Sequence, residues 1–368
     1  MQSFDYAKRI ERLRKAMANK NLDALFVTPS SDLRYLTGYD ALPLERLTCL
    51  IIVRDRPAVL LVPQLELPAA QVHGLDKFGI ELDSWTEVED PIDRLAKHTG
   101  KVTAAAVIDT MWAQKALAIQ KALEVQAVAA GRLLSDLRAV KDSEEMSAIA
   151  AAGAAIDVVH SNMGVWLRPG RTEREVSRDI AEAIIASGHQ RVDFVIVASG
   201  PNGASPHHEC SDRIINPGEP VVVDIGGTMP SGYCSDSTRM YVCGDPPSDY
   251  VAKYEVLKEA QGAAVAGVSQ GMNGKQADDL ARDILTDHGL GEYFVHRTGH
   301  GLGLDTHEEP YLVATNLEPL ETGNVFSIEP GFYIPGQYGA RIEDIVGLAE
   351  SGVVNFNNTT HELVVLPS

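Results

Sequence analysis

The stretch PVVVDIGGTMPSGYCSDSTRMYVC, residues 220–243, decides the fold of this chain. Its two apolar runs flank a turn containing glycine and proline, a pattern typical of a β-hairpin. Asp224 lies in the first run, and Asp236 follows 12 residues later in the second. Carboxylates on adjacent strands of a hairpin can face the same side of a sheet. We therefore expect Asp224 and Asp236 to share one face.

The same arrangement recurs further along the chain. Glu329, in FSIEPG, and Glu343, in ARIEDI, form a second acidic pair 14 residues apart. Helical patterns precede each set of strands, with capping boxes beginning at Asp142 and Thr172. The predicted helices cover residues 143–166, 173–187, 248–268 and 274–287, and the predicted strands include DFVIVAS (193–199) and YFVHR (293–297). An α+β domain with an internal pseudo-two-fold repeat, its acids converging at the middle, is the simplest architecture with this order.

Each of these acids has an ordinary explanation when it is taken alone. Asp224 fits a strand-end turn residue, and Asp236 fits a turn cap. Glu329 and Glu343, however, lie within apolar strands, where a carboxylate is costly to bury unless it is paired or bound to metal. His300, in TGHGLG, is flanked by glycines that let backbone approach a ligand closely. One imidazole with four carboxylates is a hard, oxygen-rich set, large enough for two divalent ions that support hydrolysis of amides or phosphoesters.

Other interpretations of these motifs have less support. GHGLG contains the G-x-G run of nucleotide-binding loops, but it lacks the βαβ context that such a loop needs. A Ser-His-Asp triad is not supported either, because the sequence has no G-x-S-x-G elbow. His207, in PHHE, and His307, in HEEP, are candidates for groups that face a substrate. A surface or core histidine is the ordinary alternative for each.

Bulk properties narrow the classes of function. At 368 residues the chain is long enough for about two domains of ~150 residues each. A net charge of −19 repels nucleic-acid phosphates and anionic lipid, and no uninterrupted apolar run approaches the ~18 residues of a membrane span. The four cysteines show no paired spacing, and the N-terminus lacks a secretory-signal pattern. We therefore expect a cytoplasmic location, with neither nucleic acid nor membrane as a partner.

The first third of the chain predicts an α/β domain. Apolar residues on one helical face predict a helix from Tyr6 to Met17. A strand at LDALFVT and a hairpin from TCLIIVR and PAVLLVP follow, and then a strand at AAAVI and an Ala-rich helix over 114–130. We place the two domains at residues 1–135 and 136–368.

Taken together, the motifs resemble the pita-bread metallopeptidase family, which holds methionine aminopeptidase, aminopeptidase P, prolidase and the metal-free creatinase. DIGG…YCSDSTR, TGHGLGLDTHEEP, SIEPGFY and GARIEDI occur in family order and at family-like intervals. RIERLRKAM, LDALFVT and YLTGYD are similar to the creatinase-type N-terminal domain. The resemblance covers essentially the whole chain. It implies an α/β creatinase-like domain over 1–135 and a pita-bread catalytic domain over 136–368.

The resemblance also implies which residues bind metal. Asp224 would chelate one divalent ion, and His300 with Glu329 would complete the other. Asp236 and Glu343 would bridge both ions. All five ligands are present, which argues against a metal-independent activity of the creatinase kind. Manganese suits so carboxylate-rich a site better than zinc, and cobalt commonly substitutes in such sites.

Further residues match the family's catalytic groups. Glu329 would carry a proton from water to the leaving nitrogen, and His207 and His307 would contact the substrate and steady the tetrahedral intermediate. Arg341 would orient neighbouring carboxylates by bidentate hydrogen bonds.

Two-domain members with HE-x-P after the metal histidine resemble Xaa-Pro enzymes, and Glu308 to Pro310 match that motif. We therefore expect an Xaa-Pro dipeptidase (prolidase) that acts on short proline-containing peptides. The alternatives are aminopeptidase P acting on longer Xaa-Pro-Yaa peptides, a lyase or other small-molecule hydrolase, and, from a different class, a catalytically silent binding scaffold. Tyr311 stands where some prolidases carry a cation, so the group that holds a dipeptide's carboxylate is not identified. The resemblance also implies a homodimer, with residues 35–44 as candidates for a cross-subunit loop.

Overall fold

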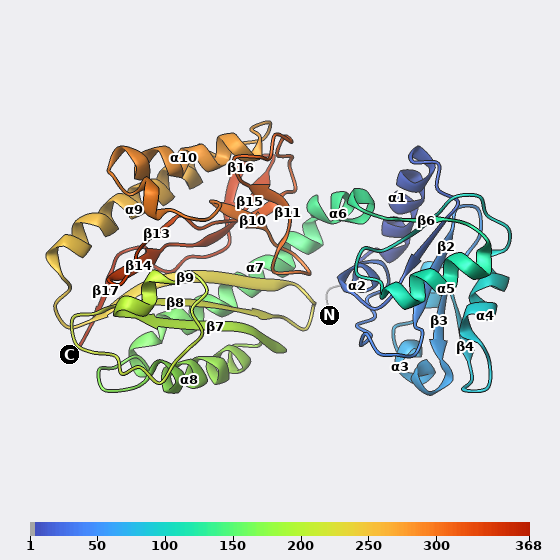
Figure 1. Cartoon of the computed structure of the whole chain (residues 1–368), viewed down its shortest axis with the longest axis horizontal. Coiled ribbons are helices and arrows are strands. Elements are labelled where there is room, and N and C mark those ends of the chain that lie inside the picture. Colours follow the sequence, from blue (N-terminus) through green and yellow to red (C-terminus); the bar gives the residue numbers. More distant parts are fainter. Residues whose placement is uncertain (1–3) are drawn as a thin grey trace. The chain divides into compact units, whose positions relative to one another are not determined.

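The computed structural model describes residues 4–368, and the chain separates into two compact units. One unit ends at Arg138, and the other is Ala139–Ser368. Figure 1 shows that each unit contains its own sheet strands and its own helices.

The first unit is built on a six-stranded mixed sheet with the order β4-β3-β2-β1-β5-β6. The predicted hairpin is present as β2 and β3, which pair antiparallel with Cys49 opposite Leu61. The elements are α1 (Tyr6–Asn19), β1 (Ala24–Val27), α2 (Ser31–Thr37), β2 (Cys49–Val53), β3 (Ala58–Pro63), α3 (Leu67–Gln71), β4 (Ile80–Trp85), α4 (Pro91–Thr99), β5 (Ala105–Val107), α5 (Ala113–Leu123), β6 (Ala127–Ala129) and α6 (Arg132–Ala139).

One prediction in this unit was wrong. The Ala-rich segment expected as a single helix over 114–130 is a shorter helix, α5, followed by a strand. The helix ends at Leu123 because Glu124 adopts a left-handed backbone conformation with φ 54°. Strand β6 then pairs in parallel with β5, Ala127 opposite Ala105. Backbone pairing at the edge of the sheet outweighs the weak helical preference of the alanines.

The second unit repeats an order of two helices followed by strands, as predicted. The capping boxes expected at Asp142 and Thr172 are both formed. The elements are α7 (Ser143–Ser161), α8 (Glu173–Ala186), β7 (Arg191–Ser199), β8 (Pro220–Thr228), β9 (Cys234–Cys243), α9 (Ser248–Gly267), α10 (Gly274–Asp287), β10 (Gly299–Gly301), β11 (Glu308–Leu312), β12 (Val325–Ile328), β13 (Gly331–Ile334), β14 (Tyr338–Arg341), β15 (Asp344–Ala349), β16 (Gly352–Asn355) and β17 (Val364–Leu366).

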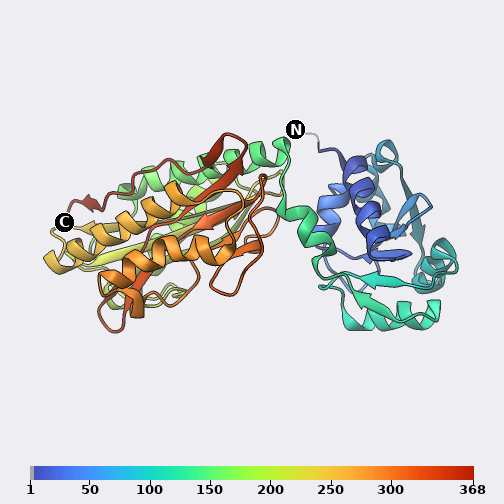
Figure 2. The same cartoon turned by 90° about the horizontal axis from the view of Figure 1, so that it is seen from above.

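The second unit contains two main sheets, and a pair of helices packs on each of them. One sheet has the order β17-β9-β8-β7 and the other β11-β10-β12-β15-β16, with β13 and β14 as a separate hairpin. Helices α7 and α8 pack on the first sheet (Figure 1). Helices α9 and α10 run side by side and pack on the strands that follow them (Figure 2). The two sheets meet where Thr238 on β9 bridges Glu343.

The segment YFVHR (293–297) is not a strand, which corrects the sequence-based prediction. A short 3-10 turn, Gly291–Tyr293, reaches its first residue, and strand β10 begins only at Gly299. Side chains hold this backbone in place of a neighbouring strand: Arg282 Nη2 donates to the carbonyl of His296 at 2.7 Å. Strand β10 pairs with β12 on one side and with β11, a strand that was not predicted, on the other.

Helix α7 has one property of a membrane span. The stretch Ser143–Val165 is the single candidate among residues 4–368 by length and composition, although no uninterrupted apolar run was found in the sequence. However, 56% of its most apolar window is buried inside the protein, and core helices pass the same test. Ile149 and Ile156 are among its fully buried side chains, so α7 is packed as a core helix.

Candidate metal centre

The first acidic pair lies on the hairpin of β8 and β9. Asp224 stands opposite Thr238, and Gly226 opposite Asp236. Opposite residues share a face of a sheet, as do residues two apart on one strand, so Asp224, Asp236 and Thr238 all point to one side. Gly226 leaves room on that face, because a side-chain carbon there would lie 2.5 Å from the ring of Phe194.

The second acidic pair lies at a bend instead of within a simple hairpin. Strands β12 and β15 pair antiparallel up to Ile328 and Asp344, and the acids Glu329 and Glu343 are the next residues on each strand. The separate hairpin of β13 and β14 continues beyond them. Thr238 Oγ1 donates a hydrogen bond to Glu343 Oε2 at 2.7 Å, which fixes this carboxylate beside the first pair.

His300 reaches the acids from β10. Its Nδ1 lies 3.1 Å from the carbonyl oxygen of Gly301, which can only accept, so Nδ1 donates a hydrogen bond there and Nε2 faces the acids. Nε2 lies 3.2 Å from Glu329 Oε1 and 3.7 Å from Asp236 Oδ2. Gly299 allows this approach, because a side-chain carbon there would meet the carbonyl oxygen of Ser327 at 1.8 Å.

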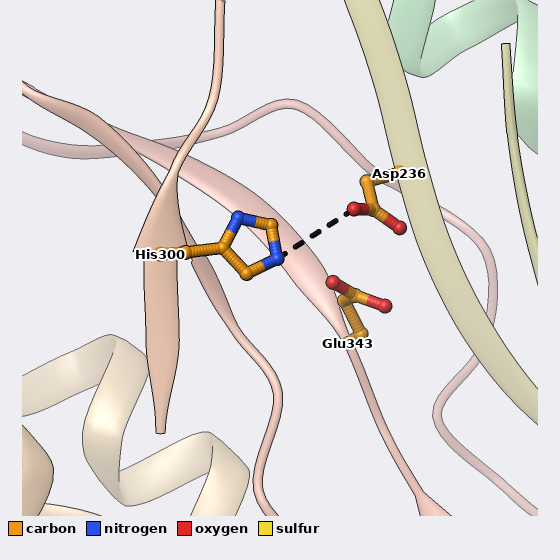
Figure 3. Close-up of side chains that lie close together, drawn as sticks. All are labelled: Asp236, His300 and Glu343. Atoms are coloured by element: carbon orange, nitrogen blue, oxygen red, sulfur yellow. Dashed lines mark ion pairs between the residues drawn. The ribbon is translucent and has the colours of Figure 1, made fainter. Parts of the chain in front are cut away.

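The structure therefore brings the five predicted ligands together. Ligand atoms of Asp236, His300 and Glu343 all lie within 4.8 Å of one another, and Figure 3 shows these side chains converging from three segments. All three are buried. Glu329 lies next to this group because its carboxylate contacts His300. Asp224 is held by Arg341, whose Nη2 donates to Asp224 Oδ2.

The raised pKa values of the clustered carboxyl groups are those expected of a site that binds cations. Burial, together with the charges of Glu343 and Asp224, raises the pKa of Asp236 well above its ordinary value. Burial and the neighbouring carboxylates likewise raise the pKa of Glu343. Asp224 Oδ1 is buried without a hydrogen-bond partner in the described structure. A divalent ion would both satisfy that oxygen and offset the repulsion.

Glu329 differs from its neighbours in ionisation. Burial alone would raise its pKa, but the hydrogen bond and charge of His300, with further help from His296 and Arg341, lower it to about 2. Ser327 Oγ donates to Glu329 Oε1 at 3.1 Å. The Glu329 carboxylate is thus the most readily ionised acid of the cluster.

Arg341 occupies the position expected of a residue that orients the carboxylates. Besides its contact with Asp224, its Nε donates to Thr238 Oγ1 at 3.0 Å and its Nη1 to the hydroxyl of Tyr333 at 2.7 Å. Its Nε also lies 3.9 Å from Glu329 Oε2.

A cavity of about 320 Å³ opens onto the cluster. It is lined by Asp193, Phe194, Ile196, His207, Asp224, Asp236, His300, Thr306, His307, Glu329, Arg341 and Glu343. Both predicted substrate-facing histidines, His207 and His307, therefore face the same space as the acids. The His307 ring stands edge-on to His300 with centroids 4.0 Å apart. Loss of water contact, with the nearby His300, lowers the pKa of His307 to about 4.

Two residues that hold the site were not identified from the sequence. Thr238 connects Arg341 to Glu343 through its hydroxyl. Arg239 donates from Nη1 to the backbone carbonyl of Glu343 at 2.6 Å, and from Nη2 to Asp344 Oδ1 at the same distance. The two-residue period along β9 could have identified Thr238, two positions beyond Asp236. The arginine within the apolar run STRMYVC was the signal for Arg239.

Comparison with known proteins places the chain in a family. Residues 147–350 match the model for metallopeptidase family M24, and residues 9–140 match the creatinase/prolidase N-terminal domain. A probable dipeptidase PepE from Mycobacterium bovis is 48% identical over 363 residues, covering 98% of this chain and 97% of the relative. An Xaa-Pro dipeptidase from Lactobacillus delbrueckii subsp. lactis is 34% identical, covering 97% and 99%.

Solved structures agree with the sequence relatives. The crystal structure of dipeptidase PepE from Mycobacterium ulcerans superposes with a TM-score of 0.93 at 49% identity, covering 99% of this chain and 98% of that one. The pita-bread architecture with a creatinase-type N-terminal domain is thereby confirmed. The chain belongs to metallopeptidase family M24, which implies a hydrolase with divalent metal ions, and the buried group of Asp236, His300 and Glu343 could hold such an ion.

Proposed function

We propose that the protein is a dipeptidase that hydrolyses the peptide bond preceding proline in Xaa-Pro dipeptides. The observation that carries the proposal is the convergence of four carboxylates and one imidazole on one small cavity. The relatives support the substrate class, since one is a probable dipeptidase and another an Xaa-Pro dipeptidase.

The five ligands would hold two divalent ions. They are Asp224, Asp236, His300, Glu329 and Glu343. The unpartnered buried oxygen of Asp224 supports this occupancy. Bound there, the ions would acidify a water molecule and polarise the scissile carbonyl. We propose manganese as the native metal, with cobalt or zinc as the alternatives, because hard oxygen donors dominate the ligand set.

Glu329 is the residue that would move the proton. Its pKa is low despite burial, with His296 and Arg341 among the causes, so the carboxylate is ionised at neutral pH and can accept a proton from the attacking water. The same carboxyl can then give that proton to the leaving nitrogen of proline. The hydrogen bond from Ser327 keeps the carboxylate oriented during both transfers.

His207 and His307 would contact the substrate. Because the pKa of His307 is about 4, its ring is neutral at pH 7 and can donate one hydrogen bond to an oxygen of the substrate without adding charge. Such donors stabilise the negative charge that develops on the carbonyl oxygen. Phe194 and Ile196 add an apolar wall that suits the ring of proline.

The size of the cavity favours a short substrate. Its volume of about 320 Å³ lies near the lower end of the range for ligand pockets, roughly 300–1,000 Å³. A dipeptide fills such a space more completely than an extended peptide.

A reconstituted assay tests the proposed function. Purified protein loaded with manganese is expected to release free proline from Xaa-Pro dipeptides, and chelation or Glu329→Gln is expected to abolish release. Glu255→Gln, at an exposed position of α9, is a matched control that should leave the rate unchanged. Release of proline that survives both chelation and Glu329→Gln would contradict the proposal.

We also propose that the protein works in the cytoplasm as a homodimer. Its four cysteines are free in the structure, which suits a reducing compartment. The chain mass is 39.7 kDa, so light scattering is expected to give twice that value, about 79 kDa. Cell fractionation checks the location. A native mass of a single chain would contradict the dimer.

A further inference from the structure

Arg297 carries a guanidinium group that pairs with no carboxylate in the described part of the chain. It is half-buried, and its guanidinium carbon lies 4.4 Å from the centre of the Tyr311 ring. Two other arginines of the same unit are engaged with carboxylates. Arg282 donates twice to Asp278, at 2.6 and 3.0 Å, and Arg341 contacts Asp224. Arg297 is therefore an available cation in a strongly acidic neighbourhood.

Its ring partner places Arg297 beside the metal cluster. Tyr311 stands directly opposite His300 where β10 and β11 pair. Opposite side chains share a face of a sheet, so the Tyr311 ring lies on the side where the His300 imidazole meets the acids. His307 precedes β11 and stands against His300. Tyr311, with the Arg297 guanidinium stacked on its ring, thus lies on the face of the sheet that carries His300, a residue of the cavity lining.

The backbone that carries Arg297 is held on both sides. The backbone carbonyl of His296 accepts a hydrogen bond from Arg282. The Nε2 atom of the His296 ring lies 2.9 Å from the hydroxyl of Tyr333. The amide of Thr298 donates to Asp278 Oδ1 at 2.9 Å. A guanidinium on fixed backbone and stacked on an aromatic ring loses little freedom when it binds an anion.

We propose that Arg297 binds the terminal carboxylate of a dipeptide substrate, an inference that rests on the proposed function. In a dipeptide this carboxylate lies only one residue, roughly 3.5 Å, beyond the scissile carbonyl. The substrate must therefore bring its negative charge into the cavity at the metal cluster, where a carboxylate without a partner is costly to bury. A guanidinium matches a carboxylate with two parallel hydrogen bonds and offsets that cost. In a tripeptide the charge lies one residue further away, so Arg297 selects for dipeptides.

Paired substrates test this assignment. Hydrolysis of an Xaa-Pro dipeptide and of its C-terminal amide is compared in manganese-loaded wild type, Arg297→Gln and Arg297→Lys. Wild type is expected to prefer the free acid about ten- to a hundredfold, from the strength of a charged hydrogen bond. Arg297→Gln should lose this preference through a higher KM for the acid alone, and Arg297→Lys should recover part of it. Arg168→Gln is the control, since it removes an exposed arginine of the same unit that forms no ion pair with the described residues.

A binding measurement gives a readout that does not depend on turnover. Proline is expected to bind wild type more tightly than prolinamide in titration calorimetry, and Arg297→Gln should bind the two equally. The proposal is overturned if Arg297→Gln keeps the wild-type preference, or if it loses acid and amide hydrolysis to the same extent. If wild type hydrolyses neither substrate, the proposed function fails. The calorimetric comparison then decides the role of Arg297, because unchanged discrimination in Arg297→Gln would refute it.

Discussion

Thr238 and Glu343 join the two sheets of the second unit at the metal cluster. The amide of Glu343 donates to the carbonyl of Thr238 at 3.2 Å, and Thr238 Oγ1 donates to Glu343 Oε2 at 2.7 Å. One residue pair therefore sets both the spacing of the sheets and the direction of a ligand carboxylate. The same hydroxyl accepts from Arg341, which contacts Asp224. Ligands from both acidic pairs are oriented through a single threonine.

Replacing that threonine should weaken metal binding without unfolding the protein. Thr238→Val keeps the shape and β-preference of the side chain but removes the hydroxyl. Loss of a residue that orients a ligand typically lowers metal affinity about 10–100-fold. Competition with a chelator measures the effect, and Thr286→Val, at an exposed position of α10, is the control. Unchanged affinity in Thr238→Val would show that the hydroxyl does not orient Glu343.

Gly299→Ala should displace His300. The new methyl would lie 1.8 Å from the carbonyl oxygen of Ser327, so β10 must move away from β12. We expect a lower thermal midpoint and loss of bound metal. Gly262→Ala in α9 meets nothing within 4 Å and should stabilise the helix by about 0.5–1 kcal/mol. Full metal content in Gly299→Ala would mean that the strand tolerates the shift.

The stability of metal-free protein should fall as pH rises, and Asp236→Asn should weaken this dependence. Burial and neighbouring charges raise the pKa of Asp236 well above 3.8. The folded chain therefore keeps a proton that the unfolded chain releases. The stabilisation from this proton is complete below the pKa of Asp236 in the unfolded chain. It is lost as pH rises through the pKa of Asp236 in the folded chain.

Thermal midpoints in chelator, measured between about pH 5 and pH 8, check this dependence. The thermal midpoint of wild type should fall more steeply with rising pH than that of Asp236→Asn, and added manganese should remove this difference in slope. Asp287→Asn, at the exposed end of α10, should keep the wild-type slope. Parallel slopes for wild type and Asp236→Asn would contradict the role assigned to charge crowding.

His307→Asn should lower turnover while leaving the metals in place. The side chain lines the cavity but carries none of the ligand atoms in the cluster. Loss of one donor to a developing oxyanion typically lowers kcat about 10²–10³-fold. His288→Asn, at the end of α10, is the control and should change neither turnover nor metal content. Loss of metal in His307→Asn would instead place the imidazole among the ligands.

Local patterns predicted much of this structure. The starts of α7 and α8 follow directly from the capping boxes at Asp142 and Thr172, because a cap is encoded within four residues. The candidate ligands could also be found, since a carboxylate such as Glu343 within an apolar run is costly unless something binds it.

What the sequence did not reveal depends on strand pairing. YFVHR has the composition of a strand, yet side chains such as Arg282 hold its backbone, so Arg297 is free to stack on Tyr311. Thr238 looks like an ordinary strand residue until Glu343 is placed beside it. Pairing over a separation of about a hundred residues leaves no local signal.

Anomalous diffraction from crystals grown with manganese tests the central claim most directly. We predict two peaks per chain, both within about 2–2.5 Å of oxygens from Asp236 and Glu343. One peak should also contact Asp224, and the other His300 and Glu329. An active enzyme with no manganese between Asp236 and Glu343 would contradict the account.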